Sequence, residues 1–342
     1  MGEGTTPAMS VVVITPDTFE TVRATVRHLR AQSVSGRLEL VIAAPAASAL
    51  APDRAEVSGF FGCKVIEVGA MTSTARARAA GVRAAGAPVV AFAEDHAFPS
   101  RGWAEALIAR HAGGEWAAVA PVMANANPRA AISWANLLVE YAPWMEGARG
   151  GEREHLPGHN GSYRRDVLLA YGDRLEAMLD AESVLHWDLR GRGHRLYLEP
   201  RARTLHLNFT AALPSAVLRF NGGRLFAAAR SRGWPRLRRL AFVAGSPLIP
   251  FVRFARVARS LPAAERPRGV LPAVFAALAC DGAGEMVGYA LGAGRAMEKL
   301  SDMEFHRHRY ISRRGRGATD AKAAADTPIE GVREATGGRV TA

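Results

Sequence analysis

The sequence predicts an α/β fold, with a mostly parallel sheet flanked by helices and a C-terminal helical extension. Short β-branched runs alternate with amphipathic segments through about the first 200 positions, and this alternation implies helical crossovers between parallel strands. Beyond that point the chain is rich in arginine and in apolar stretches interrupted by proline or acids. The 342 residues, 49% of them hydrophobic, suffice for a large core.

The expected elements follow one another in a regular order. A strand at 10–15 leads into a helix over 19–32, whose apolar residues recur at helical spacing. The stretch at 149–166 is Gly-rich and polar and predicts a loop, and a helix is expected from 174 to 190. Further strands are expected at 38–44, 64–68, 88–93, 116–122, 195–199 and 203–207, with an Ala-rich helix over 73–85.

These patterns divide the chain into four parts. Residues 1–9 form an N-terminal tail, 10–208 a sheet-based domain, 209–312 a basic and partly apolar helical extension, and 313–342 a second tail. The last part consists mainly of Gly, Ala, Thr and charged residues. Such a composition cannot bury enough apolar surface to fold, so we expect this tail to be disordered.

The basic charge lies in the C-terminal third. The whole chain carries a formal charge of +12, and 219–316 alone holds 19 Lys and Arg against six acidic residues, a net +13. Aromatic residues are not interleaved with this charge in the manner of single-strand binders, so we expect no specific nucleic-acid partner. Binding to an anionic membrane surface remains open.

Several features bear on the compartment. The two cysteines, Cys63 and Cys280, lie far apart in sequence, so we expect no disulfide framework and a reducing environment. The first residues carry neither a basic region nor an apolar run, so no signal peptide is expected. Proline and acidic residues interrupt the apolar stretches at 240–252 and 269–294, so we expect neither to span a membrane.

Three ionisable residues, Glu94, Asp95 and His96, directly follow the buried strand at 88–93. In open α/β sheets, ligands bind outside the carboxyl ends of the strands, so this triplet marks a candidate site. Carboxylate and imidazole groups both bind Mn²⁺. The alternative is a solvated turn that precedes the helix beginning near Trp103.

Four segments carry the most informative motifs of the chain. They are SVVVITPDTFETVRATVRHLRAQS, TARARAAGVRAAGAPVVAFAEDHAFPSRGW, GHNGSYRRDVLLAYGD and AESVLHWDLRGRGHRLYLEPRARTLHLN. In this order and spacing they resemble family 2 glycosyltransferases with the GT-A fold. The resemblance implies a GT-A nucleotide-diphospho-sugar transferase domain over 10–208, in which Glu94-Asp95-His96 replaces the family's DxD metal motif.

The resemblance implies sugar transfer from a nucleotide-diphosphate sugar to an acceptor hydroxyl, assisted by Mn²⁺ or Mg²⁺. A cation stabilises the charge that develops on the leaving diphosphate. Glu94, Asp95 and His96 are the implied metal ligands, and His206, at the end of the last strand of the domain, is a further candidate. For His206 alone, a hydrogen-bonded strand-end histidine is the alternative.

The attacking hydroxyl must lose a proton, which calls for a carboxylate base, and the resemblance implies that this base lies on the helix over 174–190. By its place in the family pattern, Glu182 is the candidate base. Asp180 and Asp188 remain rival candidates for the base. Asp180 lies two residues from Glu182, and on a helix this spacing makes the two side chains face different directions. His186 lies one turn after Glu182, and we expect it either to orient that carboxylate or to pack.

Other positions are implied as substrate contacts. Thr15 ends the first strand and Asp17 lies two residues after it, and the forked guanidinium of Arg78 suits a diphosphate, so these three are the implied donor contacts. His159 and Asn160 lie in the Gly-flanked loop and are implied contacts of the acceptor or the transferred sugar. The alternatives are a surface role for Arg78 and ordinary turn chemistry for the loop pair.

The chain also departs from the family pattern. No acidic residue follows the second strand, where VIAAPAAS (41–48) stands and where the family contacts the uracil or ribose. Ala79 replaces the Asn of the helix motif, and the paired Glu-Asp before the last strand is reduced to Ala181-Glu182. The nucleotide, the sugar and the full competence of the site therefore stay open.

The resemblance implies an inverting, metal-assisted glycosyltransferase. We expect it to be bacterial, with an acceptor that is lipid-linked or a cell-envelope glycan. We expect it in the cytoplasm. The basic extension either attaches it peripherally to the inner face of the membrane or packs against the domain at 10–208, for example as a dimer interface. Two alternatives remain open, a non-catalytic GT-A-like scaffold and a nucleic-acid or anionic-surface binding protein. The oligomeric state is not predicted.

Overall fold

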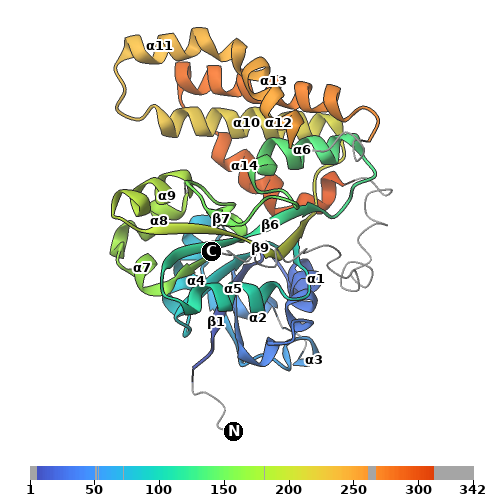
Figure 1. Ribbon diagram of the computed structural model, residues 1–342, viewed down its shortest axis with the longest axis vertical. Helices are drawn as coiled ribbons and strands as arrows, with labels where there is room; N and C mark the ends of the chain where they lie inside the picture. Colours follow the sequence, from blue (N-terminus) through green and yellow to red (C-terminus); the bar gives the residue numbers. More distant parts are fainter. Residues whose placement is uncertain are drawn as a thin grey trace, which may run out of the picture.

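The computed structural model has a helix-flanked sheet and, beside it, a separate layer of helices from the C-terminal third (Figure 1). The α/β prediction and the predicted C-terminal helices are both confirmed. The predicted tail at 313–342 lies outside the described residues. The structure describes residues 6–50, 52, 54–71, 73–180, 182–260 and 267–311.

The strands of the described residues form one sheet. They are β1 Met9–Ile14, β2 Leu38–Ala44, β3 Gly62–Glu67, β4 Val89–Ala93, β5 Ala97–Pro99, β6 Trp116–Asn125, β7 Gly151–Glu152, β8 Ser162–Arg164 and β9 Arg195–His206. Their order is β3-β2-β1-β4-β8-β6-β9-β5, with β7 paired to β9. The sheet is parallel from β3 to β4 and mixed beyond, because β8 runs antiparallel to both its neighbours.

Two details of the sheet differ from the sequence prediction. The strands expected at 195–199 and 203–207 are one strand, β9, whose register against β6 shifts between Pro121 and Val122. The stretch at 149–166 is not only a loop, because it contains β7 and the central strand β8. Strands of two or three residues are too short to show a periodicity in sequence.

The helices before the extension are α1 Phe19–Arg30, α2 Ala47–Leu50, α3 Arg54–Val57, α4 Thr74–Ala84, α5 Trp103–Ala112, α6 Ala131–Tyr141, α7 Arg165–Leu169, α8 Leu175–Asp180 and α9 Glu182–Gly191. The extension contains α10 Ala212–Arg230, α11 Arg236–Gly245, α12 Ile249–Arg259, α13 Val270–Leu291 and α14 Ala296–Phe305. The single helix predicted over 174–190 is therefore two helices, α8 and α9, and Glu182 is the first residue of the second.

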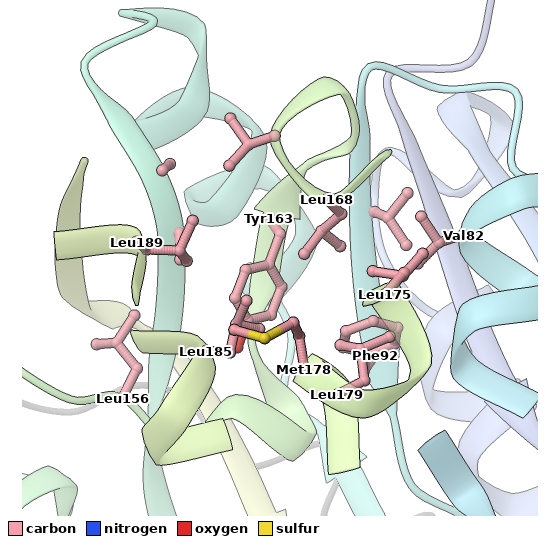
Figure 2. Close-up of a cluster of buried hydrophobic side chains, with 14 of the residues drawn as sticks. Val82, Phe92, Leu156, Tyr163, Leu168, Leu175, Met178, Leu179, Leu185 and Leu189 are labelled. Atoms are coloured by element: carbon pink, nitrogen blue, oxygen red, sulfur yellow. The ribbon is translucent and has the colours of Figure 1, made fainter. Parts of the chain in front are cut away.

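A buried apolar cluster holds α8 and α9 against the sheet (Figure 2). Tyr163 of β8 lies among Phe92 of β4, Met178 of α8 and Leu185 of α9, and all four side chains are buried. Fully burying a large apolar side chain contributes about 1.5–3 kcal/mol, so this cluster fixes the position of α9. The start of α9, where Glu182 lies, is thereby held on a rigid base.

Glycines bring the backbones of α10 and α13 into contact. A Cβ added to Gly284 would overlap the carbonyl oxygen of Phe220, and one added to Gly288 would overlap that of Arg224. Gly223 of α10 meets the α13 backbone in the same way. No side chain can be accommodated at these positions without moving a helix, so α10 and α13 form one rigid pair.

Gly284→Leu is expected to push α10 away from α13. The clash is with backbone, so the loss of stability should reach or exceed the roughly 1–3 kcal/mol typical of an overpacked core. Ala283→Leu is the matched control, because the neighbouring Ala283 is exposed. Denaturant unfolding of both variants measures the difference. Equal midpoints for the two would show that this close contact does not stabilise the extension.

The outer helices of the extension expose apolar residues. On α11 and α12, Leu237 is 82% exposed, Phe251 65% and Val252 66%, and no residue of α11 is buried. The ring of Phe251 contacts that of Phe275 on α13, with 5.3 Å between centroids, so the exposed apolar surface continues from one helix to the next. We call this area, with Leu237, Leu240, Leu248, Phe251, Val252 and Phe275, the outer apolar face.

Two helical segments of the extension are long and apolar enough to cross a membrane, by length and composition, whereas the sequence predicted neither to do so. They are Arg236–Arg259, which joins α11 to α12, and α13. Only 17% and 33% of their most apolar stretches are buried inside the structure. The two acidic residues of α13, Asp281 and Glu285, each lie 2.7 Å from Arg253 of α12.

Candidate functional site

Three side chains meet where β4 and β9 end. Glu94 and His96 follow β4, and His206 is the last residue of β9. Glu94 Oε2 lies 3.5 Å from His96 Nε2 and 3.9 Å from His206 Nε2. One ligand atom from each residue lies within 4.8 Å of the others, so this Glu-His-His group could hold a metal ion. All three residues were predicted ligands.

The far nitrogen of each imidazole is held by a neighbouring oxygen. His96 Nδ1 lies 2.6 Å from Asp95 Oδ1, and His206 Nδ1 lies 2.8 Å from Asn208 Oδ1. Both Nε2 atoms are buried and have no hydrogen-bond partner among the described residues. Metal-binding histidines are usually oriented in this manner. Asp95, predicted as a ligand, stands behind His96 in this arrangement.

The three residues of the Glu-His-His group differ in their electrostatics. Burial raises the pKa of Glu94, but the neighbouring imidazoles of His96 and His159 outweigh it and hold that pKa well below its ordinary value. Burial is the main cause that lowers the pKa of His206 to about 3, so this ring is neutral at pH 7. Burial also lowers the pKa of His96, but the adjacent carboxylates outweigh it and the net shift is upward.

The loop before β8 connects this group to Glu182. Asn160 Nδ2 donates to Glu94 Oε2 at 2.9 Å. The ring of His159 lies between two carboxylates, with Nδ1 3.2 Å from Glu94 Oε1 and Nε2 2.7 Å from Glu182 Oε1. A Cβ on Gly158 would lie 2.8 Å from the Glu182 carboxylate, so the loop needs glycine to approach this closely. The structure thus brings His159, Asn160 and Glu182 together.

The two rival acids lie in different surroundings. Asp188 Oδ2 accepts a hydrogen bond from Tyr171 OH at 2.7 Å and lies 2.6 Å from Arg192 Nε, so its carboxylate is engaged away from the Glu-His-His group. Asp180 lines the same groove as Glu182, and burial raises its pKa. Asp180 therefore remains the closer rival.

His186 packs in the core. Its Nε2 lies 3.0 Å from Tyr163 OH, and the backbone N–H of Leu156 points at its Nδ1 at 3.5 Å. Burial lowers the pKa of His186 to about 3, so the ring is neutral. Of the two expected roles, the structure shows packing, since no contact between His186 and Glu182 is found among the described residues.

Arg78 is buried between two carboxylates of the site. Its guanidinium nitrogens lie 3.8 Å from Glu94 Oε1 and 3.6 Å from Glu182 Oε1, and the group lies over the ring of Phe92. A surface role does not apply to this arginine. Both ion-pair distances exceed hydrogen-bond length, so the fork retains donors for an anionic ligand.

A small cavity of about 70 Å³ opens beside the Glu-His-His group, and its walls show which part of the loop after β1 faces the site. Pro16 lines this cavity, whereas the predicted donor contacts Thr15 and Asp17 are not among its walls. Thr15 Oγ1 donates to the carbonyl of Thr18 at 2.7 Å, and Asp17 Oδ1 accepts from the Thr18 N–H at 2.6 Å. These two side chains shape the turn into α1.

The C-terminal extension closes the cavity, which the sequence did not reveal. Glu304 and Phe305 of α14 line it, and Glu304 Oε2 lies 3.8 Å from His96 Nε2. Glu304 pairs with the buried Arg307, which donates to the carbonyl of Leu207 at 3.2 Å. No motif or periodicity singles out an acid so far along the chain from the strands it faces.

Comparison with known proteins gives structural similarity alone. No protein-family model matches the chain, and no curated protein matches it in sequence. One similar solved structure is the crystal structure of GalNAc-T7 with UDP, GalNAc and Mn²⁺, at a TM-score of 0.44 and 14% identity, covering 60% of this chain and 44% of that one. Another is the mannosyltransferase PcManGT from Pyrobaculum calidifontis in complex with GDP-Man and Mn²⁺. Its TM-score is 0.43 and its sequence identity 16%, and the match covers 93% of this chain and 85% of that one.

Proposed function

We propose that this chain is a glycosyltransferase that moves a sugar from a nucleotide-diphosphate sugar to an acceptor hydroxyl. The observation that carries the proposal is the position of His159, with the Glu-His-His group on one side and Glu182 on the other. Transfer needs both a place for cationic stabilisation of the leaving diphosphate and a carboxylate base for the hydroxyl. The motif resemblance to family 2 glycosyltransferases supports the same function.

Glu94, His96 and His206 would hold the cation, with Asp95 and Asn208 orienting the two imidazoles. Mg²⁺ prefers oxygen ligands, whereas Mn²⁺ also accepts imidazole, so two histidines favour Mn²⁺. When bound, the cation would neutralise charge on the diphosphate as the sugar leaves.

On the acceptor side, Glu182 takes the proton from the attacking hydroxyl, and His159 positions that carboxylate. Arg78 contributes a buried positive charge between Glu94 and Glu182. With Glu182 acting as a base and not as a nucleophile, transfer is a single displacement, in which the hydroxyl attacks as the diphosphate leaves. Such a displacement inverts the configuration at the sugar carbon.

The nucleotide would lie in a groove of about 850 Å³ between the β1–α1 loop and α14. Pro16 and Met71 line one part of it, and Lys299 and Ser301 of α14 line another. Pro16 also lines the small cavity beside the Glu-His-His group, so the two spaces adjoin. The helix α14 would then contact the nucleobase and the ribose, which in the family are contacted by an acidic residue after the second strand.

Turnover of donor sugars separates this function from the alternatives. The full chain should release nucleotide diphosphate from a UDP- or GDP-sugar when Mn²⁺ is present, and little when Mg²⁺ replaces it. A non-catalytic scaffold would bind nucleotide without release, and an anionic-surface binder would do neither. Absence of metal-dependent nucleotide-diphosphate binding across a panel of donors would overturn the proposal.

We further propose that the protein acts at the inner face of a bacterial membrane, on a cell-envelope acceptor. Residues of the outer apolar face are exposed beside Arg236, Arg238, Arg256 and Arg259. Apolar side chains at the acyl boundary and arginines at the headgroups are the two components of interfacial attachment. Each basic residue near an anionic membrane contributes about 1 kcal/mol, so a few suffice for reversible binding.

Vesicle flotation tests this attachment. The full chain should float with anionic vesicles at low salt and less at high salt, because salt screens the arginine contribution. The double change Phe251→Ser and Val252→Ser should reduce flotation at both salt concentrations. Phe61→Ser is the matched control, because Phe61 is exposed on the sheet domain. If the unmodified chain stays unbound at low salt, the outer apolar face is not a membrane surface.

A further inference from the structure

A groove of about 520 Å³ adjoins Glu182 between α9 and α10. His159 lines both this groove and the small cavity beside the Glu-His-His group, so its ring forms the wall between them. A ligand in the groove would therefore face Glu182 from the side opposite the donor. We call this space the α9–α10 groove.

The walls of the α9–α10 groove are largely apolar and open to solvent. Val184 and Trp187 of α9 face Leu225 and Phe226 of α10 across it. Trp187 is 47% exposed and Phe226 38%, although both are large apolar side chains. Apolar residues gathered in a concave, solvent-open place mark a binding site for an apolar group.

An exposed arginine lies at the same groove, and its charge lowers the pKa of Asp180, although burial raises that pKa overall. This residue, Arg232, forms no ion pair within 4 Å in the part of the chain that the structure describes. Its neighbour Arg230 is already engaged, since it donates to Tyr289 OH at 3.2 Å and lies over the ring of Trp234. With Asp180 beyond ion-pair distance, the guanidinium of Arg232 retains donors for an anionic ligand.

We propose that the α9–α10 groove binds the acceptor and that the acceptor is a lipid phosphate. Its hydroxyl-bearing head would reach Glu182, its apolar chain would lie between Trp187 and Phe226, and its phosphate would pair with Arg232. The inference rests on the proposed function, because it takes Glu182 as the base. The guanidinium of Arg232 at one part of the groove and the apolar walls at another favour an amphipathic anion over a soluble sugar, which would leave Trp187 and Phe226 uncovered.

Gly222 offers a way to fill the groove without disturbing the fold. It lies on α10 in the groove wall, and a Cβ there would meet no atom within 4 Å. Gly191 at the end of α9 is equally open but does not line the groove, so Gly191→Phe is the matched control for Gly222→Phe. Both changes add the same side chain to a helix, and they differ in where it projects.

Binding of decyl phosphate to the full chain tests the proposal directly. The probe should change the tryptophan fluorescence of the unmodified chain, and Trp187→Phe should remove most of that change. Gly222→Phe should weaken binding at least tenfold, while Gly191→Phe leaves it unchanged. Equal affinities for the Gly222→Phe and Gly191→Phe variants would overturn the assignment of the groove.

Decanol and inorganic phosphate separate the two parts of the ligand. The unmodified chain should bind decyl phosphate more tightly than either, and Arg232→Gln should remove the advantage of decyl phosphate over decanol. If Arg232→Gln leaves that advantage intact, the phosphate part of the proposal is wrong.

Mn²⁺-dependent binding of UDP or GDP serves as an independent reading of the donor side. Gly222→Phe should leave it unchanged, because the variant acts only on the α9–α10 groove. If the unmodified chain does not bind UDP or GDP with Mn²⁺, the proposed function is wrong. The decyl phosphate experiment would still show whether the α9–α10 groove binds a lipid phosphate.

Discussion

His206→Ala is expected to lower Mn²⁺ affinity by at least about 100-fold and to remove metal-dependent nucleotide binding. Changing a residue that merely orients a metal ligand typically costs 10–100-fold in affinity, so the loss of a ligand itself should cost more. His206 Nε2 is buried and has no hydrogen-bond partner among the described residues, so its loss removes one of the three ligand atoms of the Glu-His-His group. Calorimetry of Mn²⁺, and of UDP and GDP with Mn²⁺, measures both effects.

A matched histidine controls for loss of packing. His111 is also buried, with Nε2 2.9 Å from Ser162 Oγ, and it lies outside the Glu-His-His group. His111→Ala should therefore cost stability while leaving Mn²⁺ affinity unchanged. Asn208→Ala should fall between the two, because it frees the far nitrogen of His206 without removing the ligand. A His206→Ala protein that binds Mn²⁺ normally would remove His206 from the site.

Glu182→Gln is expected to reduce sugar transfer by about 10²–10⁴-fold, the usual contribution of a positioned general base. The amide keeps the size of the carboxylate and can still hydrogen-bond His159, but it cannot accept a proton from the acceptor. Binding of Mn²⁺ and of the donor should persist, since neither uses Glu182. Single-turnover transfer, measured beside nucleotide binding, distinguishes a lost chemical step from a lost site.

The two neighbouring acids test whether the base has been assigned to the right residue. Asp188→Asn should transfer sugar almost as well as the unmodified chain, because Asp188 is engaged with Tyr171 and Arg192. Asp180→Asn should have a modest effect from within the α9–α10 groove. A collapse of transfer in Asp180→Asn, with near-normal transfer in Glu182→Gln, would move the role to Asp180.

Periodicity predicted the elements that are long enough to show it. The β-branched strands β1, β2 and β4 and the amphipathic helix α1 are found near their expected positions. The central strand β8 was missed because its three residues lie within a Gly-rich polar stretch. Its place between β4 and β6 depends on pairing with residues far away in sequence, which a local pattern does not record.

The order of the motifs predicted where the site lies more accurately than it predicted what each residue does there. Glu94, His96, His206 and Glu182 lie within one connected set of side chains, which strand ends alone would not have shown. Whether a side chain after a strand faces the site or its own turn depends on backbone angles, and Thr15 illustrates the second outcome. Glu304 could not be predicted, because its position depends on how α14 folds back.

Because Glu304 and Phe305 of α14 line the small cavity, the extension is part of the site and cannot be removed without changing it. A chain ended at Asn208 would lack Glu304 and Arg307 and would open His96 to water, so its behaviour would report on an incomplete site. The helix α14 packs on α10, and α10 packs closely on α13. The outer apolar face is therefore connected to Glu304 through helices in direct contact. Thermodynamic linkage then makes the two binding events reciprocal: any factor by which membrane attachment strengthens nucleotide binding is the factor by which nucleotide strengthens attachment. If attachment strengthens nucleotide binding, a chain that carries its donor would bind the membrane more tightly than an empty one by the same factor.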